Sequence, residues 1–129
     1  MGSILGASVR NTDITVREKC IDIRKSALDS IGIIAGDMVD IWEEPSTMKC
    51  YMYGRKVNAL GSYNGIVRNN IKKGAGGMRV NSMKLVRYLR ARTQWTGNLK
   101  LYLGPLETIE GKRMREILID KAERYKLRR

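Results

Sequence analysis

Twelve Lys and Arg side chains, and no Asp or Glu, lie between Pro45 and Leu106. Residues 1–44 carry five basic and eight acidic side chains, and residues 107–129 carry eight basic and five acidic ones, so the net charge of +12 can be assigned to the middle segment. Solvated surfaces usually intersperse both signs, whereas a phosphate-binding surface gains by releasing counterions and is weakened by acids. The segment 45–106 therefore predicts contact with a polyanion, through eight candidate residues: Arg68, Lys72, Lys73, Arg79, Lys84, Arg87, Arg90 and Arg92.

Three of these candidates recur every three residues, which places them on one face of a predicted helix: Lys84, Arg87 and Arg90. The opposite face is apolar and consists of Leu85, Tyr88 and Leu89. Like charges at this spacing repel each other unless an anion lies beside them. The basic face is therefore the sharpest candidate for phosphate contact, although a solvated helix face has the same pattern.

Aromatic residues alternate with basic ones in the same segment. Tyr51, Tyr53 and Tyr63 lie on predicted strands among Lys and Arg residues, and Trp95 lies in a polar connection near Arg92. Bases of a single strand stack on aromatic rings placed in this way. Tyrosine is also an ordinary residue of half-buried strands, so the four rings are candidate stacking groups with a structural alternative.

The sequence KKGAGG, residues 72–77, combines basic residues with glycines, which allow backbone N–H groups to approach a phosphate. It lacks the Lys-Ser or Lys-Thr that follows the glycines in the loop of nucleotide-hydrolysing proteins. We expect a flexible basic loop that is either a linker or a clamp on a nucleic-acid backbone.

The chain contains no histidine, which excludes Ser-His-Asp and Cys-His catalysis and removes the usual proton carrier near neutral pH. Two cysteines, Cys20 and Cys50, are too few for a metal site without histidine. The densest group of acids, which we expect to face solvent, is Asp37, Asp40, Glu43 and Glu44. The sequence thus predicts a protein that is not an enzyme, with no catalytic residue, metal site or cofactor.

No stretch reaches the ~18 consecutive apolar residues of a membrane-spanning helix, and residues 1–10 lack the features of a signal peptide. Hydrophobic residues make up 43% of the chain, enough to bury a core. We expect a soluble, cytoplasmic protein without a membrane partner, whose cysteines are small buried apolar groups.

Periodicity and turn residues predict the elements of the first half. Alternating apolar residues indicate strands near 14–16, 19–24 and 49–53, with further strands at 57–60 and 62–69. Ser26 and Asp29 form the S-x-x-D arrangement that begins a helix, and Gly32 is placed to end it. Gly36 and Asp37 then form a turn before a strand around residues 39–41.

The second half repeats this outline without repeating its letters. Met78 and Val80 alternate, Asn81 or Ser82 can cap a helix, and one face of a later strand consists of Leu99, Leu101 and Leu103. We expect a single compact domain over residues 1–106 with two pseudo-repeated halves, 14–60 and 61–106. A terminal hairpin over 107–119, turning at residues 110–112, and a basic tail over 120–129 follow; the tail is either a frayed helix or an arm that orders on a polyanion.

The stretch ALDSIGIIAGDMVDIW, residues 27–42, resembles the AbrB/MazE/SpoVT swapped-hairpin family. Residues 31–33, 36–37 and 39–41 fit that family's short helix, Gly-Asp turn and strand, and the resemblance covers residues 14–53 and, more loosely, 78–103. The chain departs from the family at Arg24, where the family commonly has Pro. The family's DNA-contacting arginines lie on N-terminal strands, which are net acidic here, although four residues could still serve: Arg17, Lys19, Arg24 and Lys25.

The resemblance implies an α+β, mainly β fold of interleaved hairpins or a small barrel, with two strand–short helix–strand units in one chain. It also implies DNA binding and a role in transcription regulation. With the charge pattern, it predicts a nucleic-acid-binding protein that contacts phosphates through residues 45–106, favours DNA over RNA and is a possible homo-oligomer. The alternative is a structural or assembly protein, such as a virion or nucleoid-type component, whose basic face packs on nucleic acid or an acidic partner.

Overall fold

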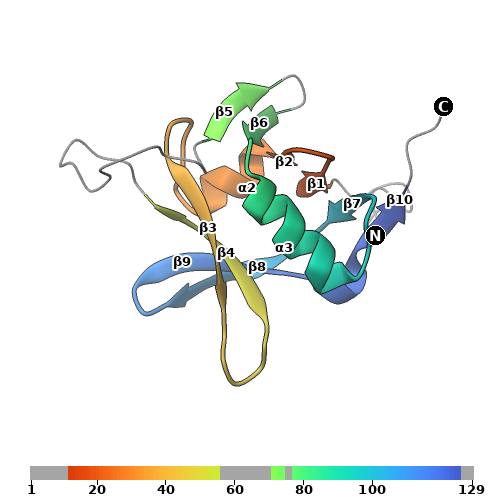
Figure 1. Ribbon diagram of the computed structural model, residues 1–129. Coiled ribbons are helices and arrows are strands. Elements are labelled where there is room, and N and C mark those ends of the chain that lie inside the picture. Colours follow the sequence, from red (N-terminus) through yellow and green to blue (C-terminus); the bar gives the residue numbers. More distant parts are fainter. Residues whose placement is uncertain (1–11, 56–70, 75–76, 126–129) are drawn as a thin grey trace, which may run out of the picture.

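The computed structural model describes residues 12–55, 71–74 and 77–125. Figure 1 shows the elements, which in chain order are β1 (Ile14–Val16), β2 (Ile21–Ile23), α2 (Lys25–Ser30), β3 (Met38–Glu43), β4 (Cys50–Arg55), β5 (Ile71–Gly74), β6 (Gly77–Val80), α3 (Met83–Thr93), β7 (Asn98–Leu101), β8 (Leu103–Ile109), β9 (Lys112–Ile117), the 3-10 helix η1 (Ile119–Lys121) and β10 (Glu123–Tyr125).

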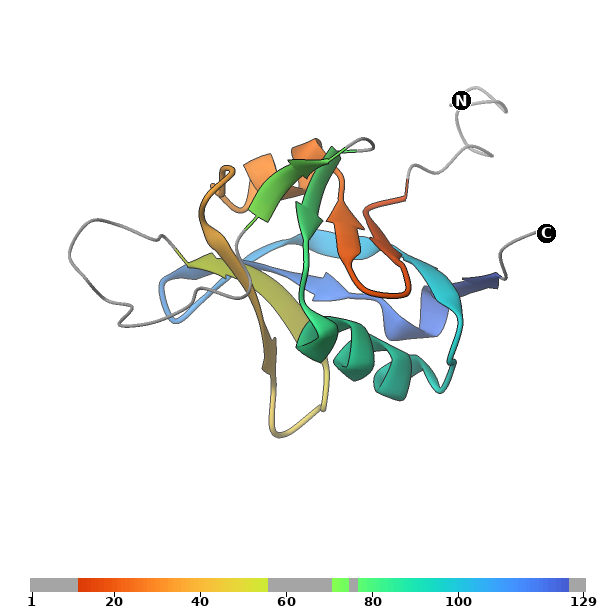
Figure 2. The same cartoon turned by 45° about the horizontal axis from the view of Figure 1, so that its top comes forward.

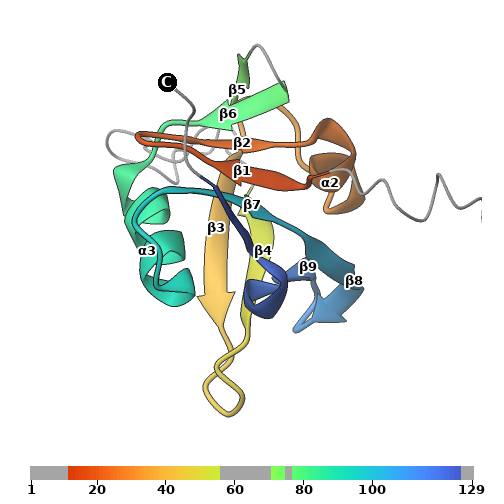
Figure 3. The same ribbon diagram turned by 90° about the vertical axis from the view of Figure 1, so that its right-hand side faces the viewer.

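The described strands form two antiparallel sheets. The first sheet has the order β10-β7-β1-β2-β6-β5, and the second has the order β3-β4-β9-β8. Figure 3 shows β5, β6, β2 and β1 side by side, with β3 and β4 running across them. No strand pairing among the described residues joins the two sheets, so they do not close into a barrel. The predicted α+β, mainly β fold is confirmed, as two sheets instead of a closed barrel.

Two strand–helix–strand units build both sheets. The first unit, residues 12–55, runs β1–β2–α2–β3–β4, and the second, residues 71–74 and 77–117, runs β5–β6–α3–β7–β8–β9. Each unit supplies one hairpin to each sheet. The units meet where β2 pairs with β6 in the first sheet and where β4 pairs with β9 in the second. Hairpins from the two units therefore lie next to each other in both sheets.

The hydrophobic core lies between the sheets and is closed by the helices. Its most buried side chains come from strands of the first sheet, from α2 and α3 and from β4 and β9, and include Val16, Ile23, Leu28, Met52, Leu89, Leu99, Leu101 and Ile117. All three leucines predicted to be buried at 99, 101 and 103 are buried, but the single strand predicted for them is wrong, because Leu99 and Leu101 lie on β7 and Leu103 lies on β8 of the other sheet. Tyr102 separates β7 from β8, where the chain leaves the first sheet for the second.

The N-cap of helix α2 lies two residues before the predicted one. Arg24 is its N-cap and makes no side-chain cap bond, so the predicted capping pair of Ser26 and Asp29 is wrong. Because the helix starts at Lys25, Ser26 already lies within the first turn, and Asp29 instead forms an ion pair with Lys25 at 3.0 Å. The predicted end is confirmed: Gly32 has φ +75° and follows the last turn.

Helix α3 begins at the predicted cap and is longer than α2. The Ser82 side chain accepts a hydrogen bond from the Leu85 N–H at 3.2 Å, which satisfies one of the free donors of the first turn. The helix ends after Thr93, and the next residue, Gln94, has a left-handed backbone with φ +55°.

Residues 72–74 and 77 belong to strands and not to the predicted loop. Lys72 and Lys73 belong to strand β5, which pairs with β6 as a hairpin. Apolar and polar residues do not alternate along β5, so the sequence gives no strand signal there. The strand forms because it pairs with β6. The predicted strands at 57–60 and 62–69 lie outside the described residues.

The predicted hairpin at 107–119 exists, but it is not a terminal appendage. Its turn consists of Glu110 and Gly111, which both have positive φ, as a two-residue hairpin turn requires. Strand β8 begins at Leu103 and crosses the boundary placed after residue 106, and β9 pairs with β4 inside the second sheet. Within the predicted tail, β10 pairs with β7, and residues 126–129 lie outside the described part.

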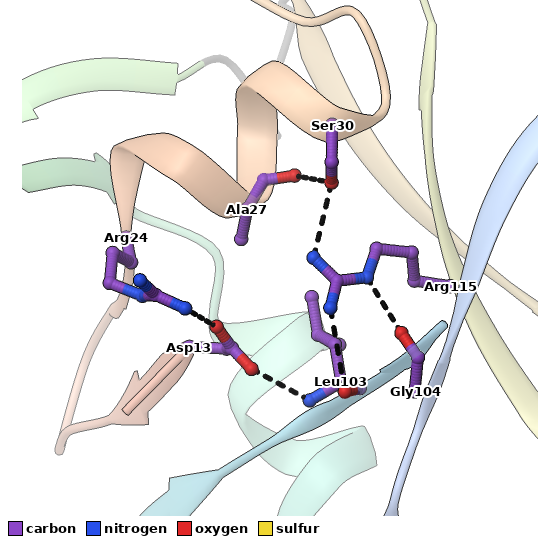
Figure 4. A network of polar contacts seen from close by, with 7 residues as sticks. All are labelled: Asp13, Arg24, Ala27, Ser30, Leu103, Gly104 and Arg115. Atoms are coloured by element: carbon purple, nitrogen blue, oxygen red, sulfur yellow. Dashed lines mark hydrogen bonds and ion pairs between the residues drawn. The ribbon is translucent and has the colours of Figure 1, made fainter. Parts of the chain in front are cut away.

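Figure 4 shows a network of polar contacts that ties α2 to strands β8 and β9. The buried Asp13 carboxylate accepts from Arg24 Nη2 at 2.5 Å and from the Leu103 N–H at 2.9 Å. Arg115 donates to the Gly104 carbonyl at 2.7 Å and to Ser30 Oγ at 3.2 Å. These two arginines are thus committed to the scaffold, because removing either leaves buried acceptors without a donor.

Candidate nucleic-acid interface

Acids of the first unit neutralise part of the basic middle segment. Three ion pairs join the two stretches of sequence: Asp22 with Arg79, Asp40 with Arg55, and Glu43 with Arg92. The shortest N–O distances in these pairs are 2.8, 3.4 and 2.7 Å. The separation of charge along the sequence is therefore partly cancelled in space, and only some of the candidate residues remain free for an anionic partner.

Two guanidinium groups share the carboxylate of Asp22. Arg79 Nε lies 2.8 Å from Oδ1, and Arg17 Nε lies 2.5 Å from Oδ2. The Asp22 side chain is only 9% exposed, whereas those of Arg17 and Arg79 are 44% and 35% exposed. Burial alone raises the Asp22 pKa, but the hydrogen bonds and charges of the two arginines outweigh burial and lower it. One buried carboxylate thus holds two cations at the surface and leaves a local excess of positive charge.

This cluster lies in a row across the first sheet. The Cα pairs Lys100–Thr15, Thr15–Asp22 and Asp22–Arg79 are directly opposite each other on neighbouring strands. Opposed residues of paired strands lie on the same face of a sheet. The exposed Lys100 Nζ lies 5.4 Å from the ring centre of Tyr125 on β10. The outer face of the first sheet therefore carries basic residues from both units.

Helix α3 presents two of its three predicted cations to solvent. Lys84 and Arg87 are exposed, and the side chain of neither forms an ion pair or a hydrogen bond with the described residues. Arg90 is instead half-buried, because it donates to the carbonyls of Gly97 at 3.1 Å and Arg17 at 3.3 Å. Figure 2 shows the turn between β1 and β2 pointing toward α3, where this last bond forms.

Arg92 is held inside a polar cluster and is not a free cation. Its guanidinium donates to Glu43 Oε2 at 2.7 Å, to the Tyr88 hydroxyl at 3.0 Å and to the Met48 carbonyl at 2.8 Å. The Tyr88 hydroxyl donates to the same carboxylate at 2.6 Å. The bond from Tyr88, with the Arg92 charge, lowers the pKa of Glu43 in spite of its burial. This cluster joins α3 to the β3–β4 hairpin.

The candidate stacking residues are less accessible than the sequence suggested. Tyr51 is 4% exposed and packs against Trp42, with ring centres 5.7 Å apart. Lys112 Nζ lies 5.2 Å from the ring centre of the half-buried Tyr53. Trp95 is half-buried, donates from Nε1 to the Asn98 carbonyl at 3.0 Å and lies beneath Arg124. These three rings contribute to packing, and Tyr63 lies outside the described residues.

The remaining predictions concern three basic residues, the two cysteines, and metal-binding or membrane-spanning features. Arg68 lies outside the described residues, and the structure defines only the backbone of Lys72 and Lys73. Cys20 and Cys50 are free and buried, and burial raises the pKa of the Cys50 thiol. Across residues 12–55, 71–74 and 77–125, no three His, Cys, Asp or Glu side chains come together as a metal site, and no helix could span a membrane.

Arg17, which the sequence offered only through the family resemblance, lies beside Arg79 because both arginines bind Asp22. In the sequence, Asp22 alternates with Ile21 and Ile23, which is typical of a residue on the opposite face of a strand. The sequence could not show that a strand from 57 residues later brings Arg79 to that carboxylate. Comparison with family models, with curated proteins and with solved structures returned no match to this chain.

Proposed function

We propose that the protein binds nucleic acid in the cytoplasm, by neutralising backbone phosphates and not by catalysing a reaction. The observation that carries this proposal is the segment 45–106, which has twelve basic side chains and no acid. Lys84 and Arg87 are its exposed cations on α3 whose side chains have no partner among the described residues. Two free, buried cysteines suit a reducing compartment.

The basic groups lie on two elements that an extended polyanion can contact together. Arg17 and Arg79 are held on the outer face of the first sheet, and Arg90 links α3 to the turn that follows Arg17. Because their common carboxylate fixes both guanidinium groups, little conformational entropy is lost when they meet phosphates. DNA is the preferred ligand because the family that the first unit resembles binds DNA.

Fluorescence anisotropy with labelled duplex DNA, single-stranded DNA and RNA, titrated across salt concentrations, tests the proposal. We expect wild-type protein to bind with a log–log salt slope of several phosphates, and K84Q/R87Q to reduce that slope by about 2. K112Q/R113Q is the matched control, since it removes two exposed cations from the β8–β9 hairpin. The absence of binding to all three ligands at low salt, or an equal loss in both variants, would contradict the proposal.

The size of the assembly separates a regulator from an assembly component. A small closed oligomer with one or two bound duplexes favours a regulator of transcription. Association into large particles with nucleic acid favours a virion or nucleoid-type component. Sedimentation velocity with and without duplex DNA distinguishes these roles.

A further inference from the structure

A groove separates helix α3 from one edge of the second sheet. Strand β3 is that edge, because it pairs only with β4 among the described strands, and Figures 1 and 3 both show α3 next to it. The groove has a volume of about 280 Å³ and is lined by Asp40, Ile41, Glu43, Lys84, Leu85 and Tyr88. Neighbouring residues of a strand point to opposite faces, so a groove that touches both Asp40 and Ile41 runs along the edge of β3.

The backbone of β3 points polar groups away from the second sheet. The Glu44 N–H donates to the Lys49 carbonyl at 2.8 Å, beside the last pair of β3 and β4. Bonded pairs alternate along an antiparallel ladder, so the backbone groups of residues 39, 41 and 43 point away from β4. Within the described part of the chain, no strand pairs with this side of β3. An edge of this kind can accept a further strand.

A side chain of β3 itself occupies one of these outward groups. The Ile41 N–H donates to Oδ1 of the preceding residue, Asp40, at 3.1 Å. The carboxylate thus takes the position in which a carbonyl oxygen of an added strand would accept this bond. The Asp40 side chain is 31% exposed, and its other oxygen lies 3.4 Å from Nη1 of Arg55. A ligand can therefore displace the carboxylate into solvent, where water replaces the lost bond.

The charges of the groove favour an acidic ligand. Both lining carboxylates already pair with arginines, that of Asp40 as described and that of Glu43 with Arg92 at 2.7 Å. Lys84 is exposed, and its side chain has no partner among the described residues. The remaining lining is apolar and consists of Ile41, Leu85 and the ring of Tyr88. The groove therefore complements an extended segment in which an acidic side chain lies near an apolar one.

We propose that the groove between β3 and α3 binds an extended acidic segment of a partner protein, which adds to the second sheet as a strand beside β3. A carbonyl of the segment replaces the Asp40 carboxylate as acceptor of the Ile41 N–H. An acidic side chain of the segment pairs with Lys84, and an apolar side chain two residues away on the same face covers Leu85. The hydrogen bond from Tyr88 to Glu43 closes one end of the groove.

Fluorescence anisotropy of the labelled, capped peptide Thr-Val-Glu-Val-Thr-Val-Thr with nucleic-acid-free protein tests the strand addition. Two further peptides carry N-methyl groups on alternate residues, one on the odd and one on the even positions. Only one alternate set of N–H groups faces β3 in an added strand. We therefore expect one methylated peptide to bind like the parent and the other to lose about tenfold or more in affinity. Equal binding of both, or no binding of the parent up to about 1 mM, overturns the proposal.

D40A should strengthen binding of the parent peptide by about threefold, because the ligand no longer has to displace a carboxylate from the Ile41 N–H. D29A is the matched control, since it removes an acid of α2 that also pairs with one cation and gives the same net charge. Binding to D29A should stay within about twofold of wild type. An equal gain in both variants overturns the proposal, because net charge alone then explains it.

K84Q tests the acidic side chain of the ligand. It should weaken binding of the parent peptide by about threefold to tenfold and leave binding of the same peptide with glutamine in place of glutamate within about twofold. An equal loss for both peptides overturns the charge pairing. Self-association of the protein that the parent peptide abolishes also overturns the proposal, because the occupant is then a second copy of this chain. Since nucleic acid is absent, these outcomes are separate from the test of the proposed function.

Discussion

The first unit ends its helix with Gly32 and the second with Gln94, yet both ends make the same two backbone hydrogen bonds. After α2, the N–H groups of residues 32 and 33 bond to the carbonyls of Asp29 and Leu28 at 3.0 Å each. After α3, the N–H groups of residues 94 and 95 bond to the carbonyls of residues 91 and 90 at 3.2 and 3.0 Å. Both ends are therefore Schellman motifs, and the left-handed residue is glycine in only one of them.

The units also differ where they touch. Asp22 of β2 lies directly opposite Arg79 of β6, so the two units bring opposite charges to one central position. Backbone hydrogen bonds define the shared strand–helix–strand course, and they place few demands on side-chain identity. The comparison teaches that the two units preserve backbone geometry while their side chains have diverged to complement each other.

The largest effect is expected from removing the charge that joins the units. D22N leaves Arg17 and Arg79 without their carboxylate and should lower the free energy of unfolding by about 2–3 kcal/mol, because charge-assisted bonds to a buried group are lost. E116Q, at an unpaired carboxylate, should change it by less than about 0.5 kcal/mol. Urea denaturation of both variants at pH 7 measures the difference.

The destabilisation by D22N is also expected to depend on pH. The Asp22 pKa is lowered in the folded protein, so its stabilisation is present above the unfolded pKa of about 3.9 and is lost as the pH falls through the folded value. The gap between wild type and D22N should therefore narrow below about pH 4. A gap that stays constant down to pH 2 would contradict the role assigned to the Asp22 charge.

A smaller effect is expected where each unit packs the residue that follows the left-handed residue at its helix end. A Cβ at Gly54 would lie 1.9 Å from Cγ1 of Ile33, and a Cβ at Gly97 would lie 2.8 Å from Nε1 of Trp95. G54A should cost about 2 kcal/mol and G97A about 1 kcal/mol, since Ile33 is buried in the core and Trp95 is half-buried and can shift. Thermal denaturation compares the two variants.

A double variant checks that G54A is destabilising because the added Cβ overlaps the Ile33 side chain. G54A combined with I33A should be less destabilising than the sum of the single changes, because the smaller side chain leaves room for the added methyl group. If the free-energy changes of the two single variants add up, the destabilisation by G54A has another origin within β4.

The smallest effects are expected at the helix ends. Q94G should raise the free energy of unfolding by about 0.5–1 kcal/mol, because glycine adopts positive φ without strain, and G32A should lower it by about 1 kcal/mol for the same reason. Urea denaturation measures both changes, which have opposite signs. A destabilising Q94G would mean that the Gln94 side chain contributes more than its backbone strain costs.

Local patterns in the sequence were sufficient for several elements. The helix end at Gly32, the cap at Ser82 and the buried leucines of 99–103 were predicted because each depends on neighbouring residues. Strand β5 was missed, since its glycine and lysines have weak strand preference and the pairing with β6 stabilises it, whereas the alternation of Met78 and Val80 in β6 was recognised.

The candidate site was predictable only in part. Exposure of Lys84 and Arg87 followed from helix periodicity, whereas the internal bonds of Arg90 and Arg92 depend on residues far away in the sequence, such as Arg17 and Glu43. Charge counts along the chain cannot distinguish a cation with a distant carboxylate from one without.

The opposition of Asp22 and Arg79 also determines which units can pair. Exchange of hairpins between two chains could join two first units or two second units, since their strands have similar courses. With the same register, a pair of first units would place Asp22 against Asp22, and a pair of second units would place Arg79 against Arg79. Like charges directly opposite on neighbouring strands are destabilising. The opposite charges at the β2–β6 contact thus favour the pairing of a first unit with a second unit, and one chain already contains one unit of each kind.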